Sequence, residues 1–157
     1  MKYMGSKNRF AKELLPIILK DRTPEQWYVE PFVGGANMID KVEGKRIGGD
    51  YNEYIANMWI ALEDGWIPRC DYTKEDFKEI KYNKNNYESC EVGYVGINCA
   101  YSGVWFSGFA GKVQTKGGVR DYQDEAFRNT TKQLPKIKGV EFVHSSYQDL
   151  EIPANSL

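Results

Sequence analysis

The feature that most constrains this sequence is a short β-type run that leads into two consecutive glycines, Tyr28–Gly35. Pro31 bends the chain after the run, and a helix is expected to follow over Gly35–Val42. Glycine has no Cβ, so the backbone here can approach a ligand closely and adopt a positive φ. The helix N-terminus would add unpaired N–H groups. The pattern predicts a nucleotide-binding corner, although a bare Gly-Gly after a strand is also typical of a simple tight turn.

A second run, Arg46–Asp50, reads as a neighbouring strand that ends in a carboxylate. An acid at the tip of the second strand is placed to accept hydrogen bonds from both hydroxyls of a ribose. The third glycine of the dinucleotide fingerprint is absent, which makes a NAD-dependent dehydrogenase the weaker alternative. Glu30 and Phe32 flank the turn, and an acid beside an aromatic ring favours a cationic cofactor over a pyrophosphate.

The composition is that of one globular domain, with 157 residues of which 41% are hydrophobic and 27% charged. The net charge is −1, so any binding to nucleic acid has to be local. Cys70, Cys90 and Cys99 are odd in number and lack C-x-x-C spacing, so we expect reduced thiols and no metal site. No signal peptide and no membrane-spanning run is found, and the sequence therefore predicts a cytoplasmic protein.

Hydrophobic spacing and capping residues predict the remaining elements. The expected helices are Arg9–Leu19 capped by Ser6 or Asn8, Glu53–Leu62 capped by Asn52, a short helix opened by the capping box Thr73–Asp76, and Asp121–Leu134 ended by Pro135. Val92–Ala100 is apolar and fits either a helix or a strand. A third strand is expected at Val140–Val143, and Pro153–Leu157 reads as a turn with a further strand starting.

Aromatic, glycine and basic residues are interleaved between Asp71 and Lys138, where basic residues modestly outnumber acids. This mixture is what a surface needs if it is to grip phosphates and read bases. The alternative is a small satellite domain in which aromatics such as Trp105 and Phe106 form their own core.

These motifs together resemble those of the Dam-type DNA adenine-N6 methyltransferases. Tyr3-Met-Gly-Ser-Lys7 resembles the family's aromatic-x-Gly-Gly-Lys motif, with Ser6 in place of a glycine. Val29–Asn37 resembles its S-adenosylmethionine loop, and Asp50-Tyr-Asn52 its ribose-binding Asp-x-Asn. Other matching segments are Asn98, Tyr101 and Gly103 in the target-recognition region and Ser146–Asp149 ahead of the catalytic strand. The likeness runs in order along nearly the whole chain.

The resemblance implies an α/β, Rossmann-like S-adenosylmethionine-dependent methyltransferase fold with an incomplete sheet. Residues 1–70 and 139–157 would form the cofactor-binding domain, and 71–138 an inserted, mainly helical target-recognition subdomain. The implied cofactor contacts are Tyr3, Lys7, Glu30, Phe32, Gly34, Gly35, Asp50, Ser146 and Tyr147. The implied contacts to double-stranded DNA are Asn98, Tyr101, Lys112, Lys116 and Arg120.

The implied reaction is methyl transfer from S-adenosyl-L-methionine to adenine N6, as in restriction–modification systems of bacteria and phages. The family's Asp-Pro-Pro-Tyr tetrapeptide, which acts on the flipped-out adenine, does not occur in these 157 residues. We therefore expect no catalytic residue here and little transfer by this chain alone. We also expect an open apolar edge beside the first strand and a complementing C-terminal fragment. The alternative is a non-catalytic DNA-binding or regulatory remnant of such an enzyme.

Overall fold

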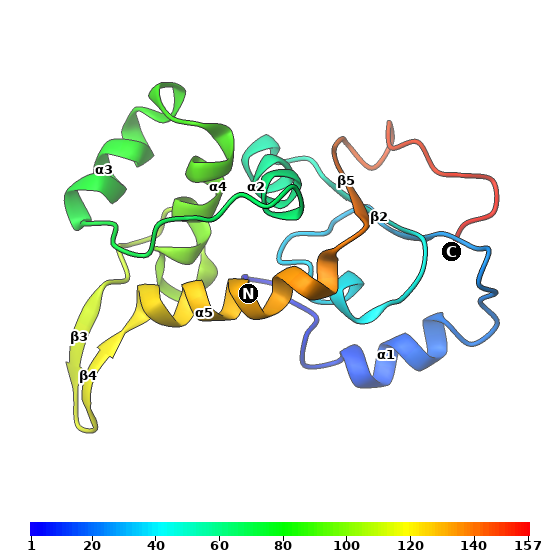
Figure 1. Ribbon diagram of the computed structural model, residues 1–157, viewed down its shortest axis with the longest axis horizontal. Helices are drawn as coiled ribbons and strands as arrows, with labels where there is room; N and C mark the ends of the chain where they lie inside the picture. Colours follow the sequence, from blue (N-terminus) through cyan, green and yellow to red (C-terminus); the bar gives the residue numbers. More distant parts are fainter.

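The computed structural model describes residues 1–157 and shows a mixed α/β protein with a small parallel sheet (Figure 1). Its three strands, in spatial order, are β1 (Tyr28–Glu30), β2 (Arg46–Asp50) and β5 (Val140–His144). All neighbours are parallel, so the carboxyl ends of the strands lie at one edge. This arrangement is one half of a doubly wound sheet and is compatible with a methyltransferase fold.

Residues Asn155–Leu157 lie along the other edge of β1. Leu157 N donates to Trp27 O over 2.7 Å, and Leu157 O accepts from Val29 N over 2.8 Å. The bridge between Trp27 and Ser156 is parallel, which confirms the prediction that a strand begins here. The predicted open edge beside β1 is wrong for the backbone groups of Trp27 and Val29, because they form hydrogen bonds with Leu157 of the same chain.

Five helices and a hairpin complete the structure. They are α1 (Ala11–Ile18), α2 (Glu53–Glu63), α3 (Lys74–Tyr82), α4 (Ser89–Asn98), the hairpin strands β3 (Lys112–Thr115) and β4 (Gly118–Asp121), and α5 (Tyr122–Ile137). Short 3₁₀ turns cover Ile39–Lys41, Lys84–Asn86 and Tyr101–Gly103. In Figure 1, α3, α4 and the hairpin lie on one side, the sheet and α1 lie on the other, and α5 runs between them.

Two predicted helix caps are confirmed. Thr73 and Asp76 form a reciprocal capping box at the start of α3, and Asn52 accepts a hydrogen bond from the backbone of Tyr54 at the start of α2. The cap predicted for α1 is wrong, because Phe10 occupies that position without a side-chain bond and Ser6 instead accepts from Asn8 N.

The helix predicted over Gly35–Val42 is also wrong, since only a 3₁₀ turn forms at Ile39–Lys41. Gly34 and Ala36 adopt positive φ values of 44° and 52°, which right-handed helix geometry excludes. The N–H of Ile39 is bound by the Glu30 carboxylate rather than by a helical carbonyl. The corner at the end of β1 therefore has no helix N-terminus.

The prediction that Pro135 ends the last helix is wrong, because α5 continues to Ile137 with the proline inside it. Arg46 explains the extension. Its buried guanidinium donates to Lys136 O and Lys138 O, each over 2.7 Å, and so satisfies carbonyls at the end of the helix. A cation at a helix C-terminus also interacts favourably with the helix dipole.

The core lies between the sheet, α2 and α4. Trp59 of α2 is fully buried and stacks on Phe142 of β5, with ring centroids 5.6 Å apart. On its other side α2 contacts α4 at Gly93, where an ideal Cβ would lie only 2.0 Å from Tyr54 O. Val92–Ala100 is thus a buried helix through Asn98. Glycine is required at position 93 because the two helix backbones approach so closely.

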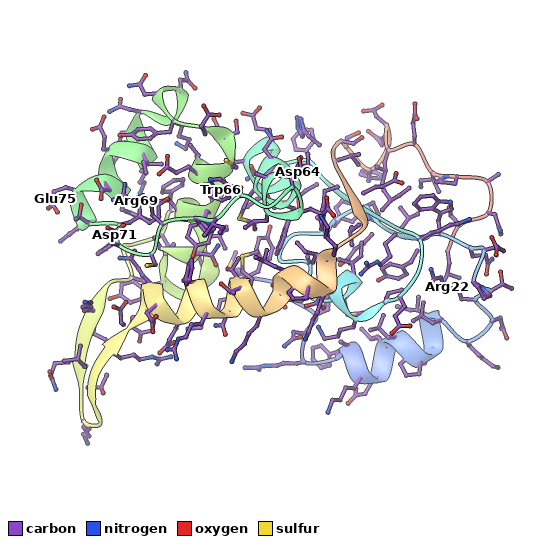
Figure 2. The ribbon with its side chains drawn as sticks, in the orientation of Figure 1. Arg22, Asp64, Trp66, Arg69, Asp71 and Glu75 are labelled. Atoms are coloured by element: carbon purple, nitrogen blue, oxygen red, sulfur yellow. The ribbon has the colours of Figure 1, made fainter.

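The parts expected to form two domains share one continuous core cluster, which contains Phe77, Phe106 and Phe142. The segment that joins α2 to α3 is anchored to this core. Trp66 packs edge-on against the buried ring of Tyr94, and the Arg69 guanidinium lies over the buried ring of Tyr72 at 4.7 Å. Figure 2 labels Trp66 and Arg69 along this segment. The division at residues 71 and 138 stays a prediction. No helix is both long enough and apolar enough to cross a membrane.

Candidate functional site

A cavity of about 460 Å³ opens at the carboxyl ends of β1 and β2. Three segments that are distant in sequence form its lining, namely the N-terminal segment, the turn after β1 and the end of β2. Seven of the nine predicted cofactor residues line it: Tyr3, Lys7, Glu30, Phe32, Gly34, Gly35 and Asp50. The volume lies within the range of small-molecule sites, roughly 300–1,000 Å³.

The carboxylate of Asp50 is held in the cavity wall by two backbone N–H groups. Gly34 N donates to Oδ2 and Asn52 N donates to Oδ1, each over 2.9 Å. These bonds tie the glycine turn to the end of β2. Each carboxylate oxygen keeps a further lone pair, so Asp50 can still accept hydrogen bonds from a ligand.

Tyr3 packs directly on the two glycines. An ideal Cβ at Gly34 would lie 2.6 Å from Tyr3 Cε1, and one at Gly35 would lie 2.7 Å from Tyr3 Cβ. The space that a Cβ would occupy is therefore filled by the protein's own ring. Gly34 and Gly35 still line the cavity, and their contact with a ligand stays a prediction. Burial and the nearby Asp50 raise the pKa of the Tyr3 hydroxyl above its ordinary value.

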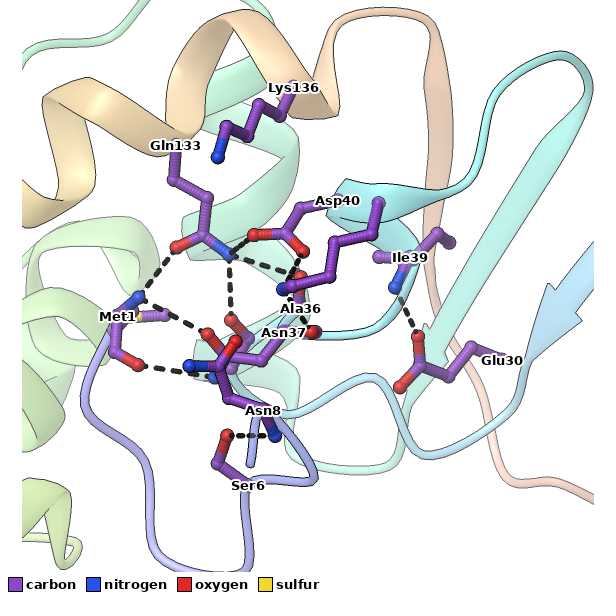
Figure 3. Close-up of polar contacts among 12 residues, drawn as sticks. Met1, Ser6, Asn8, Glu30, Ala36, Asn37, Ile39, Asp40, Gln133 and Lys136 are labelled. Carbon is purple, nitrogen blue, oxygen red and sulfur yellow. Dashed lines mark hydrogen bonds and ion pairs between the residues drawn. The ribbon is translucent and has the colours of Figure 1, made fainter. Parts of the chain in front are cut away.

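Glu30 places a carboxyl group in the same cavity, where its Oε2 accepts from Ile39 N over 3.0 Å (Figure 3). Burial raises the pKa of this carboxyl from 4.5 to about 7, and the Ile39 N–H bond opposes the rise. A cationic ligand would favour the ionised form and bring the pKa back down. Lys7 supplies a positive charge to the lining, with its Nζ donating to Gly5 O over 2.9 Å.

Ser146 and Tyr147, the two remaining predicted residues, do not line the cavity. The Tyr147 ring lies 5.5 Å from the Phe32 ring at an angle of 40°, and the two side chains are 57% and 68% exposed. An aromatic pair thus stands at the rim of the cavity. Ser146 instead donates to Asp149 Oδ2 over 2.6 Å within its own loop.

The predicted DNA contacts fall into two groups. Lys112 and Lys116 belong to the β3–β4 hairpin, which projects from the body of the protein in Figure 1. The hairpin was not predicted from the sequence, in which this segment is part of the stretch of interleaved aromatic, glycine and basic residues between Asp71 and Lys138. The signal was present in the glycines at positions 117 and 118, between runs that carry the β-branched Val113, Thr115 and Val119. The two-residue turn is Lys116-Gly117, and Gly118 begins β4.

Asn98, Tyr101 and Arg120 line a second cavity of about 270 Å³ beside the base of the hairpin. Asn98 is buried, whereas Tyr101 is 44% exposed. The guanidinium of Arg120 lies over the Tyr122 ring at 4.5 Å and bonds Glu125 Oε2 over 2.8 Å. That hydrogen bond lowers the pKa of Glu125 to about 2, so the arginine charge is already paired.

Two side chains that were not predicted from the sequence bind the carbonyls of the glycine turn and lie outside the cavity lining. Trp59 Nε1 donates to Gly34 O. Gln133 Nε2 donates to Gly35 O and Ala36 O (Figure 3). Helical periodicity assigned Trp59 to the core only. Gln133 carried no signal except its position between Thr130 and Ile137 on the buried face of α5.

Comparison with known families gives one match. The sequence profile described as D12 class N6 adenine-specific DNA methyltransferase matches residues 3–151. A search among curated proteins finds no match to the chain. The matched range takes in the cavity at β1 and β2, the hairpin and all three strands of the sheet.

Proposed function

The chain belongs to the D12 class N6 adenine-specific DNA methyltransferase family, and we propose that it binds S-adenosyl-L-methionine in the cavity at the carboxyl ends of β1 and β2. The observation that carries the proposal is the convergence of Tyr3, Lys7, Glu30 and Asp50 from three separate segments on one cavity. In doubly wound sheets, ligands sit outside the carboxyl ends of the strands, and this cavity has that position.

The charges of the cavity fit this cofactor, which has two cationic centres and one carboxylate. When bound, it supplies an electrophilic methyl group on its sulfonium. We propose that Lys7 binds the carboxylate, that Glu30 faces the cationic part and that Asp50 accepts from the ribose hydroxyls. Gly34 and Gly35 support these contacts by holding Tyr3 and Asp50 in place.

The adenine ring of the cofactor would stack at the rim of the cavity on Phe32, with Tyr147 beside it. The Phe32 and Tyr147 rings already contact each other, so we place adenine against an outer ring face rather than between the two. We do not place Ser146 in contact with the adenine ring, because Ser146 does not line the cavity.

We propose that double-stranded DNA is the second ligand. The hairpin lysines Lys112 and Lys116 would contact phosphates, which supply affinity without reading sequence. Asn98, Tyr101 and Arg120 share the second cavity and would contact the target nearby. Arg120 also orients the hairpin through its bond to Glu125.

We assign no catalytic residue to the chain, which contains no Asp-Pro-Pro-Tyr tetrapeptide. Binding of cofactor and DNA is therefore the function proposed for these residues, with a complementing C-terminal fragment as the partner for methyl transfer. Measuring transfer of a tritiated methyl group to DNA, with and without such a fragment, separates binding from catalysis.

Isothermal titration with S-adenosylhomocysteine tests the proposed site. We expect the wild-type protein to bind and Asp50→Ala to lose at least about tenfold in affinity, or about 1.4 kcal/mol. Asp21→Ala, which removes an exposed carboxylate, serves as the control and should bind like wild type. Equal binding by the Asp50 and Asp21 variants would contradict the assignment.

The alternative is a non-catalytic DNA-binding or regulatory protein of the same family. The projecting hairpin favours it, because the hairpin presents its lysines independently of the cofactor cavity. This alternative predicts salt-dependent DNA retention with no methyl incorporation.

A further inference from the structure

Side chains from two helices hold three consecutive carbonyls of the turn after β1. Trp59 Nε1 of α2 donates to Gly34 O over 2.7 Å. Gln133 Nε2 of α5 donates to Gly35 O and to Ala36 O, each over 3.1 Å. Each bond fixes the orientation of one peptide plane. The backbone that forms one wall of the cavity is thus set by groups that lie outside the cavity lining.

The turn needs this support because its backbone is strained. Ala36 has a φ of 52°, in the left-handed region where a Cβ lies too close to the following carbonyl oxygen. Ala36 is also completely buried, and buried carbonyls require partners. The Gln133 amide supplies them for two adjacent residues, one of which is Ala36 itself.

Both the nitrogen and the oxygen of the Gln133 side-chain amide form hydrogen bonds. Its side chain is only 4% exposed, and Nε2 lies 3.0 Å from Asp40 Oδ2 in addition to the two carbonyls. Its Oε1 accepts from the Met1 nitrogen over 2.8 Å (Figure 3). Gln133 therefore connects α5, the turn after β1 and the N-terminal segment that carries Tyr3. The last two are among the three segments that line the cavity.

We propose that Gln133 is a positioning residue for the cofactor cavity, acting through the peptide planes of Gly35 and Ala36. The identity of the ligand rests on the proposed function, whereas the positioning role rests on the hydrogen bonds alone. Without the amide, the Gly35 carbonyl loses its donor and the Ala36 carbonyl keeps only the Asp40 N–H, 3.3 Å away. The turn can then rotate away from the geometry that places Gly34 N on Asp50.

The first experiment compares Gln133→Met with Gln123→Met. Gln123 lies on the same helix, is similarly buried and donates to the backbone carbonyl of Tyr72, far from the turn in sequence. Each change should lower the Tm, because each removes buried hydrogen bonds. Only Gln133→Met should weaken S-adenosylhomocysteine binding, by about tenfold, because only this amide holds the cavity wall. Gln123→Met should stay within about twofold of wild type.

Hydrogen exchange on the ligand-free proteins gives a readout that does not depend on the cofactor. The amides of Gly34–Asn37 should exchange faster in Gln133→Met than in wild type or Gln123→Met. If wild type fails to bind S-adenosylhomocysteine, the proposed function fails while the exchange result still decides the positioning role. Unchanged exchange in the turn, or wild-type affinity in Gln133→Met, would overturn the inference.

Gln133→Glu provides a second variant should Gln133→Met fail to fold. The introduced carboxylate would keep the Met1 nitrogen as a donor to one oxygen, but it would face two carbonyls and Asp40 with no hydrogen to donate. Its protonated form regains one donor for them. Asp40 raises the pKa of this carboxyl, whereas the Met1 ammonium, Lys41 and Lys136 lower it. The ratio of wild-type to variant affinity should therefore shrink as the pH is lowered from about 8 to about 6. A ratio that does not change with pH would contradict a role for the donor.

Discussion

At the scale of single residues, Glu30 makes the stability of the protein depend on pH. The pKa of its carboxyl is raised from 4.5 to about 7 by burial, so between these values the folded state holds a proton that the unfolded state releases. Stability therefore falls as the pH rises through this window. The same carboxyl is the group proposed to face a cationic ligand, so the cost in stability is located at the binding site.

Replacing Glu30 by glutamine removes this titration while keeping an oxygen for the Ile39 N–H. We expect the Tm of Glu30→Gln to exceed that of wild type by an amount that grows from about pH 5 to about pH 8. Thermal unfolding at several pH values measures it, with Glu13→Gln on the first turn of α1 as the control. A constant difference across the range would argue against a raised pKa at Glu30.

At the scale of elements, the packing of α2 on α4 depends on one glycine. An ideal Cβ at Gly93 would meet the carbonyl oxygen of Tyr54 at 2.0 Å, and that atom is backbone and cannot move alone. Gly93→Ala should therefore separate the two helices and lower the free energy of unfolding by about 2 kcal/mol or more. Urea denaturation followed by circular dichroism measures the change.

Gly117→Ala is the matched control for this prediction. Its ideal Cβ has no neighbour closer than 4.0 Å, and it lies in the exposed turn of the hairpin. Its stability should change by less than about 0.5 kcal/mol. Equal effects of the two substitutions would show that the close approach of α2 and α4 is not needed.

At the scale of the whole molecule, the net charge of −1 leaves the hairpin as the place where the proposed DNA contacts gather. Lys112→Ala and Lys116→Ala combined should weaken binding of any duplex. The double substitution should also make the slope of log affinity against log salt less steep by about 1–2 if both lysines neutralise phosphates. Fluorescence anisotropy over a salt series measures this. Lys12→Ala on α1 is the control, and a slope equal to that of wild type would remove the hairpin from the interface.

Much of the sheet and most helices were predictable from the sequence, because strands and caps are encoded locally. Asn52 and the capping box at Thr73 are examples in which the side chain bonds its own helix. The turn after β1 was not predictable, since its shape depends on Trp59 and Gln133, which lie 25 and 98 positions away from the carbonyls that they hold.

The same reason explains the end of α5. A proline near the end of a periodic run predicts a stop, but Arg46 binds carbonyls 90 and 92 positions further along the chain and stabilises the helix past it. For the candidate site, motif resemblance selected seven residues that the fold brings to one cavity. It could not show that Tyr3 covers the glycines, because that contact joins two segments that only the folded chain brings together.

Helix α5 begins directly after the hairpin and carries Gln133 near its other end. The helix therefore contacts both the proposed DNA contacts and the turn that lines the proposed cofactor cavity. If a duplex on the hairpin shifts the helix and thereby raises affinity for the nucleoside, the nucleoside must raise affinity for the duplex by the same factor, as thermodynamic reciprocity demands. Order of addition would then be irrelevant to the final occupancy, and the ternary assembly would be favoured over either binary one.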